Sequence, residues 1–416
     1  MAGLNETPSG NRTHIAFFGR RNAGKSTLVN ALTGQEIAIV SDVAGTTTDP
    51  VSKAMEILPL GPCLITDTAG LDDEGALGEE RVRRSLEVLE KTDVAVWVEA
   101  GEEAPSEAEK RFLASCTARN VPVLRHRRGE PVEELKKRIA AVRLEDAPRP
   151  LIADLVSEGD TVVCVCPIDE SAPKGRLILP QQQVVREVLD AGASALVCQP
   201  AQLPGILSAY AGPRNRTIEQ SEQSNNPPVR FVITDSQAFG AVSKAVPPEI
   251  PLTSFSIVFA RAKGDLAVYC AGAAAMKSLK DGDRVLIAEG CTHHRQCNDI
   301  GTVKLPRWVE QYTGKKLRFD FSSGNAFPAL PSRPSDSFRH SIEQSEQSEQ
   351  SEQSNNPTID QYALVIQCGG CMLTRRAVQA RIARCRAAGV PITNYGIAIA
   401  ACHGIQAEPD TCMVRR

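Results

Sequence analysis

The feature that most restricts the fold is a short glycine-containing loop near the N-terminus. The segment Gly19-Arg-Arg-Asn-Ala-Gly24-Lys25-Ser26 has the pattern G-x-x-x-x-G-K-S/T and lies between an apolar run at 14–18 and a helical pattern at 26–32. In that setting backbone N–H groups converge on phosphate oxygens, and the start of the helix adds its dipole. Lys25 is expected to reach the β- and γ-phosphates, and Ser26 to hold Mg²⁺. The expected nucleotide-binding residues of the loop are Gly19, Asn22, Ala23, Gly24, Lys25, Ser26 and Thr27.

Strand-like apolar runs alternate with helical patterns along the chain. The first 142 residues predict an α/β P-loop domain with a parallel sheet and helices on both faces. A linker-like Ala147-Pro-Arg-Pro150 follows, and two further α/β domains are expected after it. We therefore divide the chain into residues 1–147, 148–228 and 229–416.

Two segments interrupt this alternation. Residues 218–227 and 342–357 share the tract Glu-Gln-Ser and contain almost no side chain that a core could bury. They are therefore predicted to be disordered insertions. Tolerated expansion at the surface is a better explanation for them than a partner-binding role.

Two further segments follow the loop in the order that a GTP-hydrolysing domain requires. Gly45-Thr46-Thr47-Thr48-Asp49 lies where a mobile loop could bring a Thr hydroxyl to Mg²⁺ and the γ-phosphate. Asp67-Thr-Ala-Gly70 follows a strand-like run, so that Asp67 can hold Mg²⁺ through water and the Gly70 N–H can sense the γ-phosphate. The expected catalytic residues are Lys25, Thr47, Asp67 and Gly70, and Thr46 joins the binding set.

Together these motifs resemble the translation-factor-like GTPases that include the tRNA-modifying and Era-type enzymes. In the potassium-activated members of that group an Asn at the place of Asn22 helps to hold a monovalent cation. The resemblance therefore implies a dependence on K⁺ as a hypothesis, with the cation in the role of an arginine finger.

The motif that selects guanine is missing. An N-K-x-D sequence is expected after the strand at 121–124, but the chain reads Arg125-His-Arg-Arg-Gly-Glu130 and enters a helix at Pro131. The GTPase domain therefore looks truncated after its fifth strand. We expect intact phosphate chemistry with weakened, poorly selective base recognition; a misassembled gene model would give the same pattern.

The thirteen cysteines must be explained in a chain that shows no export signal, where disulfides are not favoured. Cys291 follows a strand-like run at 283–288, and the C-x-x-C pair Cys368 and Cys371 follows another at 362–366. Ligand sites lie at such strand ends in α/β sheets. Three cysteines suit a [4Fe–4S] cluster with one open iron, whereas the same cysteines with His293 suit zinc equally well. A redox dithiol is less favoured.

Taken together, the motifs resemble the HydF family, the GTPase maturases of [FeFe]-hydrogenase. The segments that carry the resemblance are 40–50, 172–180, 252–257, 262–266 and 391–396. The family pattern C-x-H, spacer, H-C-x-x-C is matched by Cys291, His293, Cys368 and Cys371. Gln367 stands where the second His belongs, so this position is not expected to bind the cluster. The fourth iron would then be held by His293, Glu289, water or a delivered ligand.

The resemblance implies a division of labour among the three domains. Residues 1–147 would hydrolyse GTP with Mg²⁺, residues 148–228 would form a homodimer, and residues 229–416 would bind the [4Fe–4S] cluster. A transient diiron precursor would be loaded on that cluster. The implied partners are the radical-SAM maturases HydE and HydG and the apo-hydrogenase, with GTP turnover timing their exchange.

Composition argues against other classes of partner. The net charge of −3 and the aromatic content of 4% do not favour a nucleic-acid-binding protein. No apolar run approaches the length needed to cross a bilayer, so no membrane association and a cytoplasmic location are expected. Two alternatives stay open: a GTPase that acts on RNA and carries a structural zinc, and a degenerate nucleotide-binding module without hydrolysis.

Overall fold

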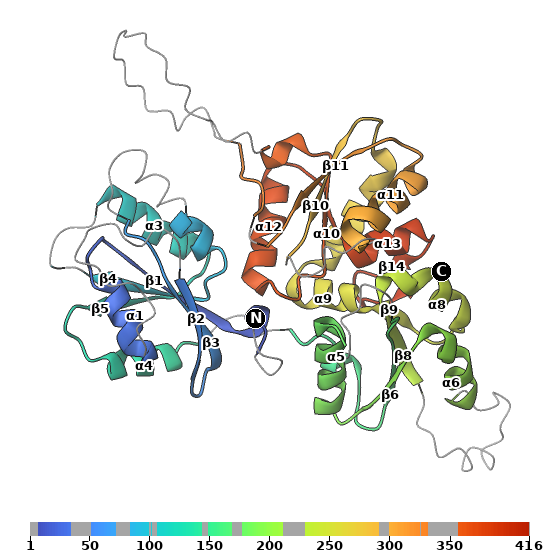
Figure 1. Ribbon diagram of the computed structural model, residues 1–416, viewed down its shortest axis with the longest axis horizontal. Coiled ribbons are helices and arrows are strands. Elements are labelled where there is room, and N and C mark those ends of the chain that lie inside the picture. The colour runs from blue at the N-terminus through green and yellow to red at the C-terminus, as the bar shows by residue number, and fades with distance from the viewer. Residues whose placement is uncertain are drawn as a thin grey trace, which may run out of the picture. The chain divides into compact units, whose positions relative to one another are not determined.

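A computed structural model describes residues 7–34, 51–71, 84–99, 101, 106–143, 149–168, 177–210, 229–290, 299–324, 326–331 and 357–415. The chain forms two compact units (Figure 1). The first comprises residues 1–148 with 372–377, and the second comprises residues 149–371 with 378–416. Apart from Pro357, the two Glu-Gln-Ser inserts lie outside the described residues. In the part of the chain that is described, no helix is both long and apolar enough to cross a membrane.

The first unit confirms the predicted P-loop domain. Among its described residues the sheet has the order β2-β3-β1-β4-β5, in which only β2 runs antiparallel to its neighbour. Its strands and helices are β1 (Thr13–Gly19), α1 (Lys25–Thr33), β2 (Val51–Ile57), β3 (Gly61–Asp67), β4 (Val94–Glu99), α3 (Glu107–Ala118), β5 (Val123–Arg127) and α4 (Val132–Ala140). Within these residues the sheet ends at β5, which agrees with the expected truncation after the fifth strand.

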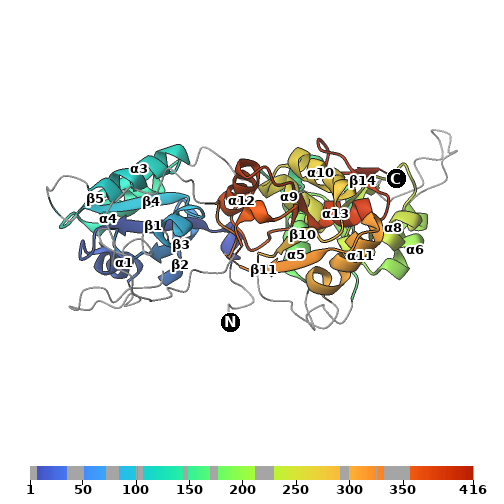
Figure 2. The ribbon, with the colours of Figure 1, turned by 90° about the horizontal axis from the view of Figure 1, so that it is seen from above.

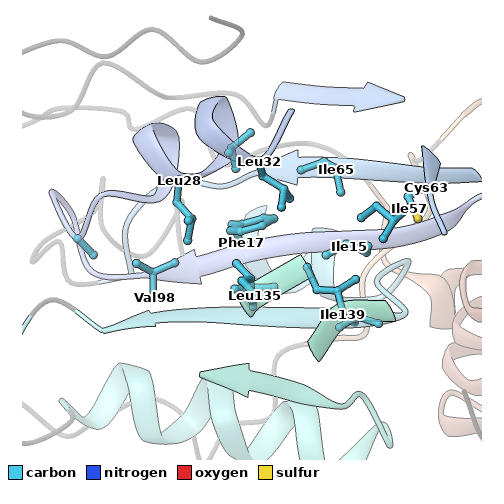
Figure 3. Packing of buried hydrophobic residues seen from close by; sticks show 14 residues of the cluster. Ile15, Phe17, Leu28, Leu32, Ile57, Cys63, Ile65, Val98, Leu135 and Ile139 are labelled. Atoms are coloured by element: carbon cyan, nitrogen blue, oxygen red, sulfur yellow. The ribbon is translucent and has the colours of Figure 1, made fainter. Parts of the chain in front are cut away.

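Alternate side chains of β1 point into two cores, because successive residues of a strand face opposite sides of the sheet. Ile15 and Phe17 pack with residues of α1 and α4, among them Leu135 (Figure 3). On the other face Phe18 packs against Phe112 of α3, with ring centroids 4.5 Å apart. Figure 2 shows α3 and α1 on opposite sides of the sheet. The strand that leads into the phosphate loop is thus buried on both faces.

The second unit contains two sheets. The first has the order β14-β15-β9-β8-β6-β7 within the described residues, and β7, β6, β8 and β9 run parallel. Its elements are β6 (Thr161–Val165), α5 (Leu179–Asp190), β7 (Ser194–Cys198), α6 (Leu203–Tyr210), β8 (Val229–Thr234), α8 (Phe239–Ala245), β9 (Leu252–Ser254), α9 (Phe255–Lys263), β14 (Gln406–Ala407) and β15 (Val414–Arg415). The expected division at residue 228 falls inside this sheet. The insert before β8 looks like a linker in the sequence, yet β7 and β8 lie on either side of β6.

The second sheet of this unit is entirely parallel and has the order β11-β10-β12-β13 within the described residues. Its elements are α10 (Leu266–Ala275), β10 (Arg284–Ala288), α11 (Leu305–Thr313), β11 (Arg318–Ser322), β12 (Leu364–Gln367), α12 (Arg375–Ala387), β13 (Ile392–Asn394) and α13 (Tyr395–Cys402). Because all four strands run in one direction, their carboxyl ends meet at a single edge.

The two sheets repeat one arrangement. In each, the first strand along the chain lies between the second and the third, and the fourth pairs with the third. A helix, α9 or α13, starts directly after the fourth strand. The register agrees as well: the residues that align across the strand ends are Val165, Thr234 and Ser254 in the first copy and Ala288, Gln367 and Asn394 in the second.

Candidate functional site

The loop between β1 and α1 has the backbone conformation that a phosphate-binding loop needs. Gly19, Asn22 and Gly24 have φ angles of 146°, 57° and 92°. A Cβ at Gly19 would lie 2.4 Å from the backbone oxygen of Val98, so no larger residue fits there. Because α1 begins at Lys25, its first N–H groups open into the loop.

The Lys25 side chain lies inside this loop. It is only 7% exposed, and its Nζ donates to the backbone oxygens of Gly19 at 3.1 Å and Arg20 at 2.7 Å. A buried ammonium at the centre of the loop is placed to neutralise phosphate oxygens. The contact of Lys25 with phosphate stays a prediction.

Arg20 fixes the loop from outside. Its Nε and Nη2 donate to the two carboxylate oxygens of Glu109, both at 3.0 Å. Glu109 is 3% exposed and also accepts from the Ser106 backbone N–H at 2.6 Å, which caps α3. Burial alone would raise the pKa of Glu109, but the hydrogen bonds from Arg20 and Ser106 outweigh it and hold that pKa below its usual range. Glu109 was not among the residues expected from the sequence.

Asp67 and Ser26 meet as a pair that could hold Mg²⁺. The Ser26 Oγ donates to Asp67 Oδ2 at 2.6 Å, and the Asp67 side chain is fully buried. The other carboxylate oxygen, Oδ1, is buried without a hydrogen-bond partner in the described part of the chain. Mg²⁺ prefers oxygen ligands of this kind, so the two residues fit the cation.

Gly70 lies against the phosphate loop. A Cβ at Gly70 would lie 2.6 Å from the backbone nitrogen of Arg21, and the next residue, Leu71, donates its N–H to the Gly19 oxygen at 3.3 Å. The Asp67–Gly70 segment therefore joins Lys25 and Ser26 at one place, as predicted. Thr46 and Thr47, the other predicted members, lie outside the described residues.

Asp67→Asn is expected to stabilise the nucleotide-free protein while weakening Mg²⁺-dependent nucleotide binding. Burial raises the pKa of Asp67, although Ser26 and Lys25 partly oppose it, so the ionised carboxylate costs stability at neutral pH. A gain of about 1 kcal/mol would raise the Tm by about 2–4 °C. Thermal unfolding without nucleotide, followed by titration with Mg²⁺-GTP, checks both parts; a lower Tm would contradict the first.

Ion pairs surround the end of β5, the strand after which a guanine-reading motif is expected. Arg125 and Arg127 of β5 both contact Glu99, each at 3.2 Å, and Glu130 contacts Arg138 of α4 at 2.9 Å. β5 ends at Arg127 and α4 begins at Val132, and residues 125–131 contain no Asn or Asp. The carboxylates described at the end of β5, those of Glu99 and Glu130, are thus paired with arginines, and no Asn or Asp stands between β5 and α4 to read the base.

Two of the three predicted cluster cysteines lie at the carboxyl edge of the four-stranded sheet. Cys368 follows β12, and its Sγ accepts from the Gly290 N–H at 3.0 Å and the Gly370 N–H at 3.4 Å. Gly370 has a φ of 68°, which allows the tight turn to Cys371. Gly290 is the residue directly before Cys291, so the loop that carries the third cysteine starts against the Cys368 sulfur.

The donor set of this turn fits an iron–sulfur cluster. Thiolates are the ligands of such clusters, and N–H groups on their sulfurs tune them. Burial raises the pKa of Cys368, whereas the N–H groups of Gly370 and Gly290 and the Arg381 charge lower it. Within the described ranges no three potential ligands converge on one point. Cys291 and His293, the remaining predicted ligands, lie outside those ranges.

Two buried cations accompany this turn. Lys263, the last residue of α9, is 8% exposed and donates from Nζ to the backbone oxygens of Gly370 at 3.1 Å and Cys371 at 3.2 Å. Burial lowers its pKa to about 8, and the nearby thiols oppose that change. Arg381 of α12 donates to the Gly324 oxygen at 2.6 Å and interacts electrostatically with Cys368.

Gln367, which replaces a histidine of the family pattern, is directed toward α10. It is 1% exposed, and its Nε2 donates to the Tyr269 hydroxyl at 3.3 Å. Glu289, one of the predicted fourth ligands, accepts from the Tyr395 hydroxyl at 3.2 Å. Asn394 donates from Nδ2 to the Cys368 oxygen at 3.2 Å and so holds the start of the turn.

Three family models match successive parts of the chain. One described as a 50S ribosome-binding GTPase matches residues 14–126. The hydrogen maturase F dimerization domain matches residues 151–264, and the hydrogen maturase F tetramerization domain matches residues 267–408. These last two matches are separated only by residues 265 and 266 and together span more than half of the chain. The chain belongs to the hydrogen maturase F (HydF) family. The first unit of this HydF chain is a GTPase domain.

Curated relatives share that domain. The tRNA modification GTPase MnmE of Zymomonas mobilis is 34% identical over 184 residues, which are 44% of this chain and 39% of that protein. The GTPase Der of Campylobacter fetus is 38% identical over 109 residues, 26% of this chain and 23% of that protein. The HydF chain thus spans well under half the length of either relative. Among solved structures, Era of Aquifex aeolicus is 16% identical and covers 75% of this chain and 92% of its own, with a TM-score of 0.25.

Two residues that lie in the sites of this HydF chain, Glu109 and Lys263, were not predicted from the sequence. Glu109 had a local signal, because Ser106-Glu-Ala-Glu109 has the S-x-x-E pattern of a capping box. Lys263 lies within the segment 262–266 that carries the family resemblance. It ends a helix whose first six residues are apolar apart from Ser256, and a charged residue that continues such a run is a signal for a buried polar role.

Proposed function

We propose that this chain hydrolyses GTP in its first unit and carries a [4Fe–4S] cluster in its second, on which the diiron precursor of [FeFe]-hydrogenase is assembled and delivered. The observation that carries the proposal is the C-x-x-C turn at the edge of a parallel sheet, with two backbone N–H groups on the Cys368 sulfur, in a HydF chain that also holds a P-loop. The proposed cluster ligands are Cys291, Cys368 and Cys371. The remaining coordination position, on the fourth iron, is occupied by His293, Glu289, water or the cargo.

The predicted site residues of the first unit have distinct tasks in hydrolysis. Lys25 neutralises the β- and γ-phosphates, and Asp67 with Ser26 and Thr47 holds Mg²⁺. The Gly70 N–H responds to the γ-phosphate, so that hydrolysis alters the segment after β3. When bound, the cluster in the second unit supplies an iron site with an exchangeable ligand.

The proposed partners are those that the resemblance to the HydF family implies. HydE and HydG would load the precursor, the apo-hydrogenase would receive it, and GTP turnover would time the exchange in the cytoplasm. The chain would act as a homodimer through its hydrogen maturase F dimerization domain. Exposed apolar side chains on and beside the edge strand β7 support self-association, with Leu189 58% and Val197 45% exposed.

Anaerobic reconstitution with iron and sulfide tests the proposal. We expect a brown protein with about four irons per chain, the spectrum of a [4Fe–4S] cluster, and steady-state GTP hydrolysis. Addition of protein loaded by HydE and HydG to apo-hydrogenase should then produce hydrogen evolution. A colourless preparation that binds zinc in place of iron would overturn the cluster assignment.

The absence of a base-reading carboxylate predicts low nucleotide selectivity. Two hydrogen bonds from guanine to an Asp would each contribute about 1.5–3 kcal/mol, and no Asp follows β5 here. We therefore expect the Kd values for GTP and ATP to agree within about tenfold. Competition of unlabelled GTP and ATP against a fluorescent GTP analogue measures the ratio. A preference for GTP of several hundredfold would contradict the prediction.

Asn22 predicts a dependence on monovalent cations. Its φ of 57° places it at the sharp bend of the phosphate loop, where a cation could take the role of an arginine finger. GTP hydrolysis in K⁺ is expected to exceed that in Na⁺ at the same ionic strength, and Asn22→Ala is expected to remove the difference. Equal rates of the unaltered protein in both salts would count against this role.

A further inference from the structure

We infer that Lys263 is a positioning residue of the cluster site: its buried ammonium holds the Cys368–Cys371 turn and brings a positive charge to the bound cluster. The inference rests on the proposed function, because it concerns the group that these cysteines hold. Lys263 lies in the segment that matches the dimerization domain, whereas the cysteines lie in the segment that matches the tetramerization domain. Both segments therefore contribute to one site.

Residues at both ends of helix α9 contact the turn or a residue that binds it. Near its start, a Cβ at Gly369 would lie 3.4 Å from the Ser256 Oγ, which donates to Asn394 Oδ1 at 3.0 Å. Asn394 in turn holds the Cys368 oxygen. At the end of the helix, Lys263 Nζ binds two carbonyl oxygens on the far side of the turn, those of Gly370 and Cys371. The backbone of the turn is thus held by Lys263 of α9 directly and by Ser256 of α9 through Asn394.

The repeated arrangement of the two sheets shows that Lys263 is not a general feature of this helix. The helix N-caps Ser254 and Asn394 are equivalent, and the same spacing aligns Lys263 with His403. The His403 ring lies next to Gly240, where a Cβ would be 3.2 Å from its Cε1. Each helix therefore reaches the connection after the third strand of the other copy. The connection after β12, which carries the C-x-x-C, is contacted by the ammonium of Lys263, whereas the connection after β8 is contacted by the imidazole of His403.

The chemistry of a bound cluster explains why a lysine stands at position 263. A cluster with three thiolate ligands becomes more negative when it accepts an electron, and a buried positive charge stabilises that reduced state. The same ammonium donates two hydrogen bonds to the backbone of the turn, which would keep the two cysteines in place for the cluster. Removal of Lys263 should therefore lower the reduction potential and speed the loss of iron.

The test compares Lys263→Met and Lys263→Gln with the unaltered full-length chain after anaerobic reconstitution. Lys263→Met loses both charge and donor, whereas Lys263→Gln keeps an N–H donor. Lys277→Met, at an exposed position of the same unit, is the matched control. The readouts are iron content, the rate of iron release to a chelator, and the potential at which the reduced-cluster paramagnetic signal appears.

We expect both Lys263 variants to show a more negative potential, and Lys263→Met to release iron about tenfold faster than the unaltered protein. Lys263→Gln should release iron at a rate between the two, and Lys277→Met should match the unaltered protein. If circular dichroism shows that Lys263→Met is unfolded, the potential and the iron-release rate of Lys263→Gln decide the test. Unchanged potential and release rate in a folded Lys263→Gln would overturn the inference, whereas an unaltered protein that takes up no iron would instead overturn the proposed function.

Discussion

Lys25→Ala is expected to reduce GTP turnover by about 100-fold or more while leaving the iron content of the reconstituted protein unchanged. The buried ammonium is the positive charge that the loop offers to the phosphates, and its loss leaves the oxygens of Gly19 and Arg20 facing them. Phosphate release from GTP, measured beside iron content on the same preparation, gives both quantities.

Lys110→Ala is the matched control for this variant. Lys110 lies on α3 of the same unit, and its side chain is 58% exposed and pairs only at the surface with Glu107. Such pairs contribute little to stability, so turnover should stay at the level of the unaltered protein. A Lys25→Ala protein that is folded and still hydrolyses GTP normally would show that the loop does not act on phosphate.

Cys368→Ser is expected to abolish the cluster and leave GTP turnover within about twofold of the unaltered protein. The Cys368 sulfur is the one on which the Gly290 and Gly370 N–H groups converge, and a serine oxygen is a poor ligand for cluster iron. Iron and sulfide content after anaerobic reconstitution, together with the visible spectrum, measures the loss.

Cys270→Ser controls for the removal of a thiol elsewhere in the same unit. Cys270 is half-buried, and its Sγ donates to the Ala407 oxygen at 3.5 Å, a bond that a serine hydroxyl can also make. This variant should keep its cluster. If Lys25→Ala and Cys368→Ser each lose both the cluster and GTP turnover, the assignment of the two activities to separate units is wrong.

The parts of the site that the sequence could predict are those built by short stretches of chain or by a general rule of sheets. The phosphate loop comes from consecutive residues, so its motif already contains Lys25 and Ser26. Asp67 joins them because β3 pairs with β1 in parallel, which brings the strand ends together. The same rule predicted that the Cys368 turn would meet the end of β10.

Contacts between distant residues could not be predicted from local patterns. Lys263 reaches Gly370 across 107 positions of the sequence, and Arg20 reaches Glu109 across 89. No spacing rule connects such residues, because the contact depends on how helices pack on their sheets. The expected division at residue 228 differs from the observed sheet for a related reason: an insert without apolar residues resembles a domain linker, and only strand pairing shows that the sheet continues beyond it.

The repeated arrangement of the two sheets indicates positions at which labels can be attached to this protein. Both Glu-Gln-Ser tracts occur in the same connection, the one that precedes the third strand of each copy, β8 or β12. A chain enters a parallel strand at the edge opposite its carboxyl end, so β8 and β12 both begin at the edge of their sheet that lies opposite the carboxyl ends, and the cysteine turn follows the carboxyl end of β12. Fluorophores or affinity tags attached where β8 or β12 begins would therefore report on partner exchange from the edge of the sheet opposite the carboxyl ends of its strands.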